Sequence, residues 1–212
     1  MIKAVLFDID GVLIDSINAN TKFFQDLLSK AGYSPPTAAQ FNGLFHATMF
    51  DVIKILTKST SDTEVQRIWE MGNKRVVPYP NHLLILQKGV LEIVQKLYKK
   101  YPLGIVTSRV KNGVFEFPKL AALQQYFSVI VAYEDTKNHK PDPEPLLFAA
   151  KNLHVNPSDV VYIGDMENDI LAAKAAGMKV IIFSAEHFPS ADRCTSSFEK
   201  IPALIESLSS EQ

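Results

Sequence analysis

The chain has 212 residues, of which 47% are hydrophobic and 21% are charged. This balance is typical of a globular protein that buries one good core and has room for a small second domain. The 22 Lys and Arg residues nearly cancel the 23 Asp and Glu residues, and the net charge of −1 excludes a global field that would recruit nucleic acid or an anionic membrane.

The cysteine count and the hydropathy pattern limit the cellular compartments in which the protein can be expected. One cysteine, Cys194, excludes an internal disulfide and a cysteine-based metal site, and its free thiol suits a reducing environment. No apolar stretch reaches the roughly 20 residues of a membrane span, and no signal sequence precedes the first apolar run. We therefore expect a cytoplasmic protein with neither a membrane nor a nucleic acid as partner.

The first apolar run, residues 2–7, is short enough for a fully buried strand, and it ends on Asp8 and Asp10, followed by Gly11. Ligands of open parallel α/β sheets bind outside the carboxyl ends of the strands, so two acids at this position indicate a reactive pair. A simple hairpin turn is the alternative. The helical pattern that follows, without a return strand, disfavours it.

The next 60 residues show helical patterns and no strand. Ser16 is placed to cap the first helix, which runs to about Ala31 and ends at Gly32. Further apolar positions recur at helical spacing over residues 38–45, 49–56 and 65–71. We therefore expect residues 17–79 to form a small helical cap domain.

Strands and helices alternate from residue 80 onward. Apolar runs predict strands over residues 103–106, 128–132, 160–163 and 180–183, and helical patterns lie over 91–98, 120–123, 146–153, 170–176 and 198–208. Such alternation gives a mostly parallel sheet covered on both faces. The predicted fold is α/β, with a Rossmann-like core domain made of residues 1–16 and 80–212 and the helical cap inserted into it.

Polar side chains follow each of the first four core strands. In chain order they are Asp8 and Asp10, Thr107 and Ser108, Lys140, and Asp165 with Asp169. Adjacent parallel strands lie about 4.8 Å apart, so these side chains can converge on one pocket. Clustered carboxylates repel unless a cation neutralises them, and oxygen ligands suit Mg²⁺, which a substrate phosphate completes. We expect a Mg²⁺ cofactor and a small phosphorylated metabolite as partner.

These segments resemble the four motifs of the haloacid dehalogenase superfamily, in its branch of phosphoglycolate phosphatase and β-phosphoglucomutase-like proteins with a helical cap. The matching segments are Asp8-Ile9-Asp10-Gly11, Val106-Thr107-Ser108, Lys140-Pro141-Asp142-Pro143 and Gly164-Asp165-Met166-Glu167-Asn168-Asp169. Each is weak alone, but all four occur in order at predicted strand ends. The resemblance covers nearly the whole chain and is weakest across the cap.

The resemblance implies a role for each matching residue. Asp8 would attack phosphorus to form an aspartyl-phosphate, and Asp10 would protonate the leaving alcohol and then deprotonate the hydrolytic water. Thr107 and Ser108 would bind phosphoryl oxygens, and Lys140 would offset the charge of Asp8 and of the phosphate.

The same resemblance implies the metal site. Asp165 would bind Mg²⁺ together with Asp8 and the Asp10 carbonyl. Asp169 would act from outside the ligand shell, fixing a metal-bound water or Lys140.

Other activities stay open as alternatives. Asp10 disfavours the dehalogenases and phosphonate-cleaving members, which lack this second aspartate. Mutases of the β-phosphoglucomutase kind carry a histidine early in the first cap helix, where this chain has Asn20. A non-catalytic phosphate-binding regulator is the third possibility, and the intact pair of acids argues against it. The prediction is a Mg²⁺-dependent phosphatase, monomeric or weakly dimeric, acting on phosphoglycolate, a sugar phosphate, a nucleotide or pyrophosphate.

Substrate selection is expected in the cap. Gly43 and His46 lie where this family often has a specificity loop, and Asn20 and Arg109 are further candidates for substrate contact. Lys74-Arg75 is better explained as a solvated helix end than as an anion site.

Overall fold

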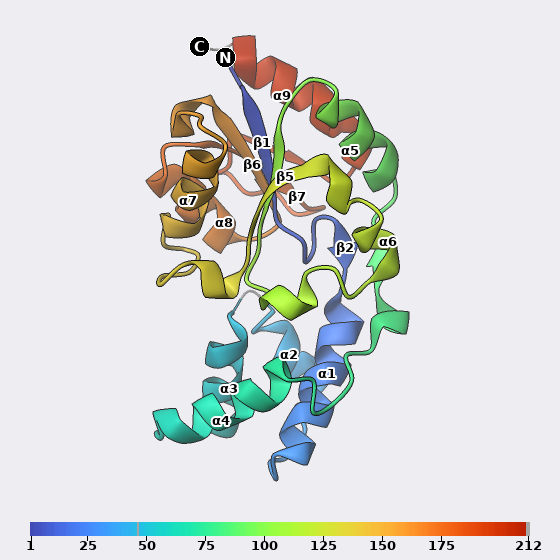
Figure 1. Ribbon diagram of the computed structural model, residues 1–212, viewed down its shortest axis with the longest axis vertical. Helices are drawn as coiled ribbons and strands as arrows, with labels where there is room; N and C mark the ends of the chain where they lie inside the picture. Colours follow the sequence, from blue (N-terminus) through green and yellow to red (C-terminus); the bar gives the residue numbers. More distant parts are fainter. Residues whose placement is uncertain (46, 211–212) are drawn as a thin grey trace.

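The computed structural model describes residues 1–45 and 47–210. The molecule has two parts stacked along its long axis (Figure 1): a sheet with its covering helices, and a helical part formed by α1–α4. Within the described ranges, no helix is both long and apolar enough to cross a membrane.

The sheet has six parallel strands in the order β5-β4-β1-β6-β7-β8. The strands are β1 (Ala4–Phe7), β4 (Leu103–Val106), β5 (Phe127–Val131), β6 (Val160–Gly164), β7 (Lys179–Phe183) and β8 (Arg193–Thr195). On the central strand β1, Phe7 pairs with Ile105 of β4 and Ile163 of β6. The three central strands therefore end at the same level, which confirms the expected α/β fold and places their following residues side by side.

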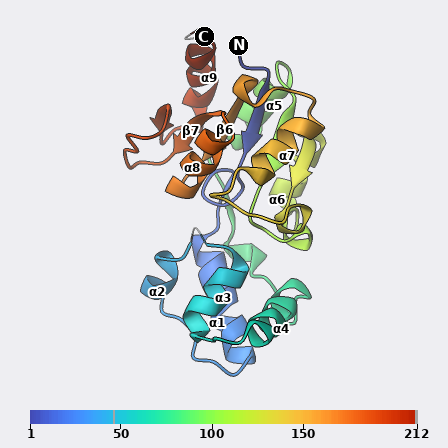
Figure 2. The ribbon, with the colours of Figure 1, turned by 90° about the vertical axis from the view of Figure 1, so that its left-hand side faces the viewer.

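Helices cover both faces of the sheet (Figures 1 and 2). One face carries α5 (Val90–Tyr98), α6 (Pro118–Ala121) and α9 (Ile201–Ser210); the other carries α7 (Glu144–Asn152) and α8 (Glu167–Ala175). Within β1, Val5 and Phe7 join the first hydrophobic cluster, whereas Ala4 and Leu6 join the second. This period-two alternation with both faces apolar explains why the strand reads as a continuous hydrophobic run.

The helical part contains α1 (Ile17–Lys30), α2 (Ala38–Asn42), α3 (Met49–Thr57) and α4 (Asp62–Asn73). The side chains of Thr37, Thr48 and Ser61 cap α2, α3 and α4 by accepting backbone N–H bonds. These helices bury their apolar faces against one another in a separate cluster that includes Phe23, Leu27 and Ile53. The helical part thus has its own hydrophobic core.

Two features differ from the predictions. A short strand β2 (Ile14–Asp15), which pairs antiparallel with β3 (Ile85–Leu86), was not expected, and neither was β8. β2 does not pair with β1, whose neighbours are β4 and β6, so the first strand does not turn back in a hairpin. Strands of two or three residues carry no readable periodicity, and the partner of β2 lies about 70 residues away. Short 3₁₀ helices occupy Asn81–Leu83, Lys111–Gly113, Gln124–Tyr126, Tyr133–Asp135, Pro157–Asp159 and Phe198–Lys200.

Candidate active site

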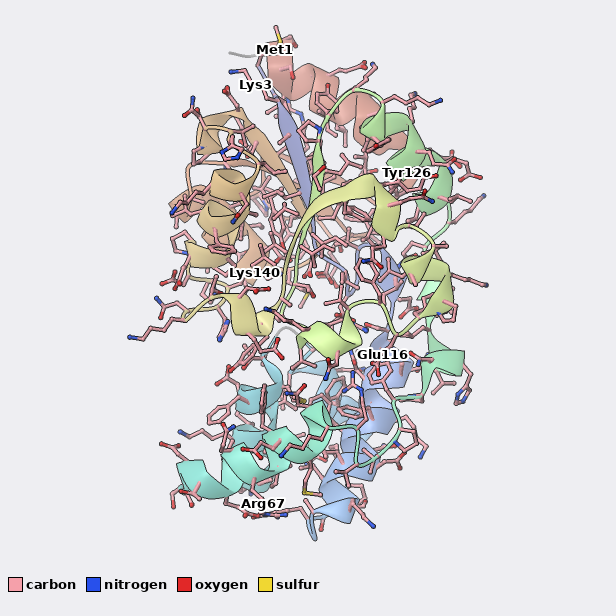
Figure 3. The ribbon with its side chains drawn as sticks, viewed as in Figure 1. Met1, Lys3, Arg67, Glu116, Tyr126 and Lys140 are labelled. Atoms are coloured by element: carbon pink, nitrogen blue, oxygen red, sulfur yellow. The ribbon has the colours of Figure 1, made fainter. Side chains whose placement is uncertain are left out.

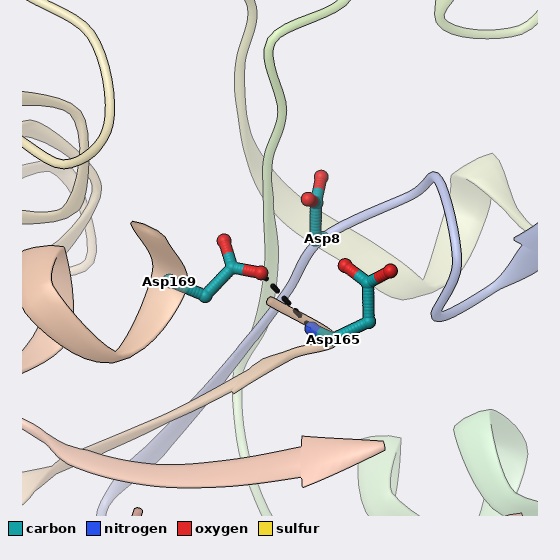
Figure 4. A group of neighbouring side chains, drawn as sticks. All are labelled: Asp8, Asp165 and Asp169. Atoms are coloured by element: carbon teal, nitrogen blue, oxygen red, sulfur yellow. Dashed lines mark hydrogen bonds between the residues drawn. The ribbon is translucent and has the colours of Figure 1, made fainter. Parts of the chain in front are cut away.

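Three carboxylates meet at the carboxyl ends of the central strands (Figure 4). Asp8 follows β1, Asp165 follows β6, and Asp169 lies in the first turn of α8. Each offers an oxygen, and these oxygens all lie within 4.8 Å of one another. Burial, reinforced by the neighbouring carboxylates, raises the pKa of Asp8 to about 6 and that of Asp165 to about 9.

This cluster is suited to a divalent cation. Its donors are all oxygen atoms, the ligands that Mg²⁺ prefers. Burial, and after it the neighbouring carboxylates, raise the pKa of Asp8 and Asp165 and so disfavour their charged forms. A cation between these two side chains would stabilise those charged forms.

Lys140 joins the cluster from the loop between β5 and α7 and lies where the two parts of the molecule meet (Figure 3). Its Nζ donates to Asp8 Oδ2 at 2.7 Å, to Asp169 Oδ1 at 2.7 Å and to the hydroxyl of Tyr162 at 2.8 Å. Although burial would lower the pKa of Lys140, Asp169 and Asp8 raise it well above its ordinary value. Lys140 is therefore a fixed positive charge beside Asp8.

Asp169 organises this corner of the site. While Oδ1 accepts from Lys140, Oδ2 accepts the backbone N–H groups of Asp165 at 2.9 Å and Met166 at 3.1 Å. Burial would raise its pKa, but Lys140 and these N–H groups hold the pKa below its ordinary value. Both oxygens of Asp169 are thus engaged in positioning the lysine and the loop that carries Asp165.

Gly11 makes room for Asp165. It has φ +77°, and a Cβ added there would lie 1.9 Å from Asp165 Oδ2. Glycine is favoured at this position both by the left-handed backbone and by the close approach of the carboxylate.

Asp10 faces a different set of partners. Arg109 Nε lies 2.7 Å from Asp10 Oδ2, and Arg109 Nη2 lies 2.7 Å from Asp10 Oδ1. Oδ1 also accepts from the Ser16 hydroxyl and from Asn20 Nδ2. Burial would raise the pKa of Asp10, but Arg109, Ser16 and Asn20 together hold it below its ordinary value.

The predicted capping role of Ser16 is wrong. The residue stands at the N-cap position of α1, but its side chain makes no capping bond and donates instead to Asp10.

A tyrosine links the partners of Asp10. The Tyr79 hydroxyl donates to Asn20 Oδ1 at 2.6 Å and accepts from Arg109 Nη2 at 3.2 Å. Asn20 lies in α1, soon after the chain enters the helical part, and Tyr79 lies where the chain returns to the sheet. The hydrogen-bond network around Asp10 therefore includes residues from both connections between the two parts.

A cavity of about 120 Å³ lies between the strand ends and the helical part. On the strand side its wall includes Asp8, Asp10, Ser108, Arg109, Val110, Gly113, Lys140, Asp165, Met166, Asn168 and Asp169. On the other side it is lined by Asn20, Phe23, Phe24, Phe41, Leu44, Phe45, Ala47, Met49, Val52, Arg75 and Tyr79. The polar strand ends thus face a largely apolar wall.

Several predicted residues lie away from this cavity. Thr107 is buried, its Oγ1 accepts the Arg109 N–H at 3.2 Å, and it is absent from the lining, whereas its neighbour Ser108 is in it. Gly43 is exposed and outside the wall, and His46 lies outside the described residues.

Two contributors were not anticipated. Tyr162 accepts a hydrogen bond from Lys140. It is the one residue with a hydroxyl in the otherwise apolar strand Val160–Gly164, so the sequence could have indicated that it has a polar partner. Tyr79 follows a proline in a segment without periodicity, and nothing in the sequence indicates its partners.

Comparison with known proteins identifies the family. The sequence model of the haloacid dehalogenase-like hydrolases matches residues 5–183. The chain belongs to the haloacid dehalogenase-like hydrolase family. The resemblance inferred from the four motifs is therefore confirmed.

Curated relatives and solved structures of this family agree with that assignment. The pyrophosphatase PpaX of Bacillus pumilus is 32% identical over 84% of this chain and 81% of its own length. The phosphoglycolate phosphatase of Neisseria meningitidis is 30% identical over 83% and 77% of the two chains. A haloacid dehalogenase-like hydrolase from Bacteroides fragilis superposes with a TM-score of 0.85 and 27% identity, covering 95% of this chain and 100% of the other.

Proposed function

We propose that this hydrolase is a divalent-metal-dependent phosphatase that cleaves a small phosphate monoester through an aspartyl-phosphate on Asp8. The observation that carries the proposal is the setting of Asp8 in the cavity wall. One carboxylate oxygen accepts the Ile9 N–H at 2.7 Å, and the other accepts from Lys140. The names of the relatives, a pyrophosphatase and a phosphoglycolate phosphatase, support phosphate as the group transferred.

In the first step an oxygen of Asp8 bonds to phosphorus while the bond from phosphorus to the ester oxygen breaks. The leaving oxygen takes a proton from Asp10, the second acid at the same strand end. In the second step water attacks the aspartyl-phosphate, Asp10 accepts the proton, and Asp8 and inorganic phosphate are released. Arg109 contacts both oxygens of Asp10 and helps to hold its pKa below the ordinary value, so one oxygen must leave Arg109 and take up a proton before it can protonate the leaving oxygen, while the other stays paired with Arg109.

Lys140 and the carboxylate cluster supply the electrostatics of the transfer. Phosphoryl transfer depends mainly on positioning and on offsetting negative charge, and Lys140 lies where it can do both for Asp8. Mg²⁺ held by Asp8 and Asp165 would supply the remaining positive charge. Asp169 would keep Lys140 and the Asp165 loop in place.

Residues 17–79 would serve as the cap of this enzyme. The helical part closes one side of the cavity, so it can exclude water from the reacting phosphate and contact the leaving group. Asn20, where mutases would carry a histidine, is held by Asp10 and Tyr79, which supports hydrolysis over mutase chemistry.

Phosphate release from phosphorylated metabolites with Mg²⁺ tests the proposal. Asp8→Asn should lower the rate by on the order of 10⁴-fold or more, because the nucleophile is lost. The matched control is Asp26→Asn, on an exposed face of α1. Chelation of the metal should also abolish release, and added Mg²⁺ should restore it. Release that survives in Asp8→Asn would overturn the aspartyl-phosphate route.

A further inference from the structure

The apolar wall of the cavity is built from the aromatic core of the helical part. Ring centroids connect Tyr79 to Phe23 at 5.3 Å, Phe23 to Phe24 at 5.7 Å, Phe24 to Phe41 at 5.1 Å and Phe41 to Phe45 at 6.4 Å. All five side chains line the cavity. The aliphatic side chains of Leu44, Met49 and Val52 continue this surface. A group that leaves the phosphate on this side therefore meets mostly carbon atoms, and the polar groups beside them belong to Asn20, Arg75 and Tyr79.

The cations in the wall are already paired within the chain. Arg75 donates through Nε to Glu116 Oε1 at 2.7 Å, and its Nη2 contacts the other carboxylate oxygen of Glu116. Arg109 is paired with Asp10, and Lys140 lies between two carboxylates. Among the described residues, the cavity wall thus offers no unpaired cation to a second negative charge on a substrate.

The neutral polar groups on the helical side are paired as well. Asn20 uses its oxygen for Tyr79 and its nitrogen for Asp10 and Ser16, and the Tyr79 hydroxyl is bound between Asn20 and Arg109. A sugar hydroxyl buried here would lose its bonds to water without gaining protein partners, which is unfavourable.

We infer that the enzyme selects phosphate monoesters whose leaving group is uncharged and apolar, with an aromatic ring as the best match to the wall. The inference rests on the proposed function, because it names the substrate class of that same site. The inference disfavours the substrates that the relatives' names indicate, pyrophosphate and phosphoglycolate, because their leaving groups, phosphate and glycolate, are anions. Such a charge would be buried against aromatic side chains without a counter-ion.

A pair of matched esters tests the inference. Benzyl phosphate and phosphoglycolate both release a primary alcohol, whose departing oxygen is bonded to a CH₂ group, which keeps the departing atom chemically similar. With Mg²⁺ present, we expect kcat/KM for benzyl phosphate to be at least 10-fold higher than for phosphoglycolate. Inorganic pyrophosphate should have a kcat/KM as low as that of phosphoglycolate. A wild-type preference for phosphoglycolate or pyrophosphate would overturn the inference while leaving the phosphatase proposal intact. Release from none of the esters would overturn both.

A charge placed in the wall should invert this preference. Leu44→Arg puts a cation on the apolar side, so kcat/KM should fall for benzyl phosphate and rise for phosphoglycolate, changing their ratio at least 10-fold. Met49→Lys is the second variant should Leu44→Arg fail to fold, as judged by thermal unfolding. Leu147→Arg, on the exposed surface of α7, is the control and should leave the ratio unchanged. A ratio that stays constant in folded wall variants would overturn the inference.

Discussion

The two walls of the cavity are built in opposite ways. The strand-side wall presents carboxylates and a lysine that hydrogen bonds and ion pairs fix to the ends of a parallel sheet. The helical wall presents aromatic rings that belong to a second hydrophobic core. In the proposed function this difference would divide the labour, because the sheet would perform the phosphoryl transfer and the helices would select what leaves. Changes in the first wall should therefore slow every ester equally, whereas changes in the second should alter the ratio between esters.

After the loss of the nucleophile Asp8 itself, the largest effect is expected from Lys140→Met, which keeps the length of the side chain and removes its charge. The rate should fall by roughly 10²–10³-fold for benzyl phosphate and phosphoglycolate alike, because Asp8 and the phosphate lose a preorganised positive charge. Steady-state kinetics on both esters measures it, with Lys151→Met on the exposed face of α7 as control. A fall in rate for only one of the two esters would mean that Lys140 recognises the leaving group, which contradicts the separate roles of the two walls.

A smaller effect is expected from Gly11→Ala. The new Cβ would displace the Asp165 carboxylate, so the concentration of Mg²⁺ needed for half-maximal activity should rise by roughly 10–100-fold. Gly32→Ala is a matched control because Gly32 also has positive φ, at +91°, but has open space around it. Titration with Mg²⁺ distinguishes them. Equal Mg²⁺ requirements in the two variants would mean that Asp165 does not hold the metal.

The smallest effect is expected from Arg75→Met. Arg75 lines the cavity and also joins its two walls through an ion pair with Glu116. Arg75 and Glu116 are 20% and 21% exposed, and they connect the end of the helical part to a loop of the core. Loss of the pair should lower the free energy of unfolding by about 1 kcal/mol, with no change in the ratio between esters.

Urea unfolding with a double-mutant cycle, adding Glu116→Gln, measures that pair. The control is the exposed pair of Lys22 and Asp26, at 51% and 40%, where coupling should be smaller. A selective loss of phosphoglycolate turnover in Arg75→Met would show that Arg75 binds an anionic leaving group after all.

The strand-side wall was predictable because the backbone dictates it. Apolar runs locate buried strands, parallel strands end at one edge, and so Asp8, Lys140, Asp165 and Asp169 could be brought together from sequence alone. Asp8 and Asp10 are two residues apart, yet they face different partners, and no spacing rule reveals this.

The helical wall was not predictable in the same way. Phe23 and Phe41 have the periodicity of ordinary helix cores, and the sequence does not show that the same rings also border a cavity. Arg109 was a candidate for substrate contact, but its direction depends on the tertiary approach of Asp10. Such contacts between distant segments leave no local pattern.

The ribbon of β2 and β3 limits how the two parts of the molecule can move. Both connections to the helical part pass through it, and the Gln87 N–H extends the pairing to Leu13 O at 3.0 Å. Two independent tethers would let the helical part translate and twist in many directions. Because the two connections are hydrogen-bonded to each other, we expect them to act as one joint, so that the helical part moves mainly by a swing about a single axis that opens and closes the cavity.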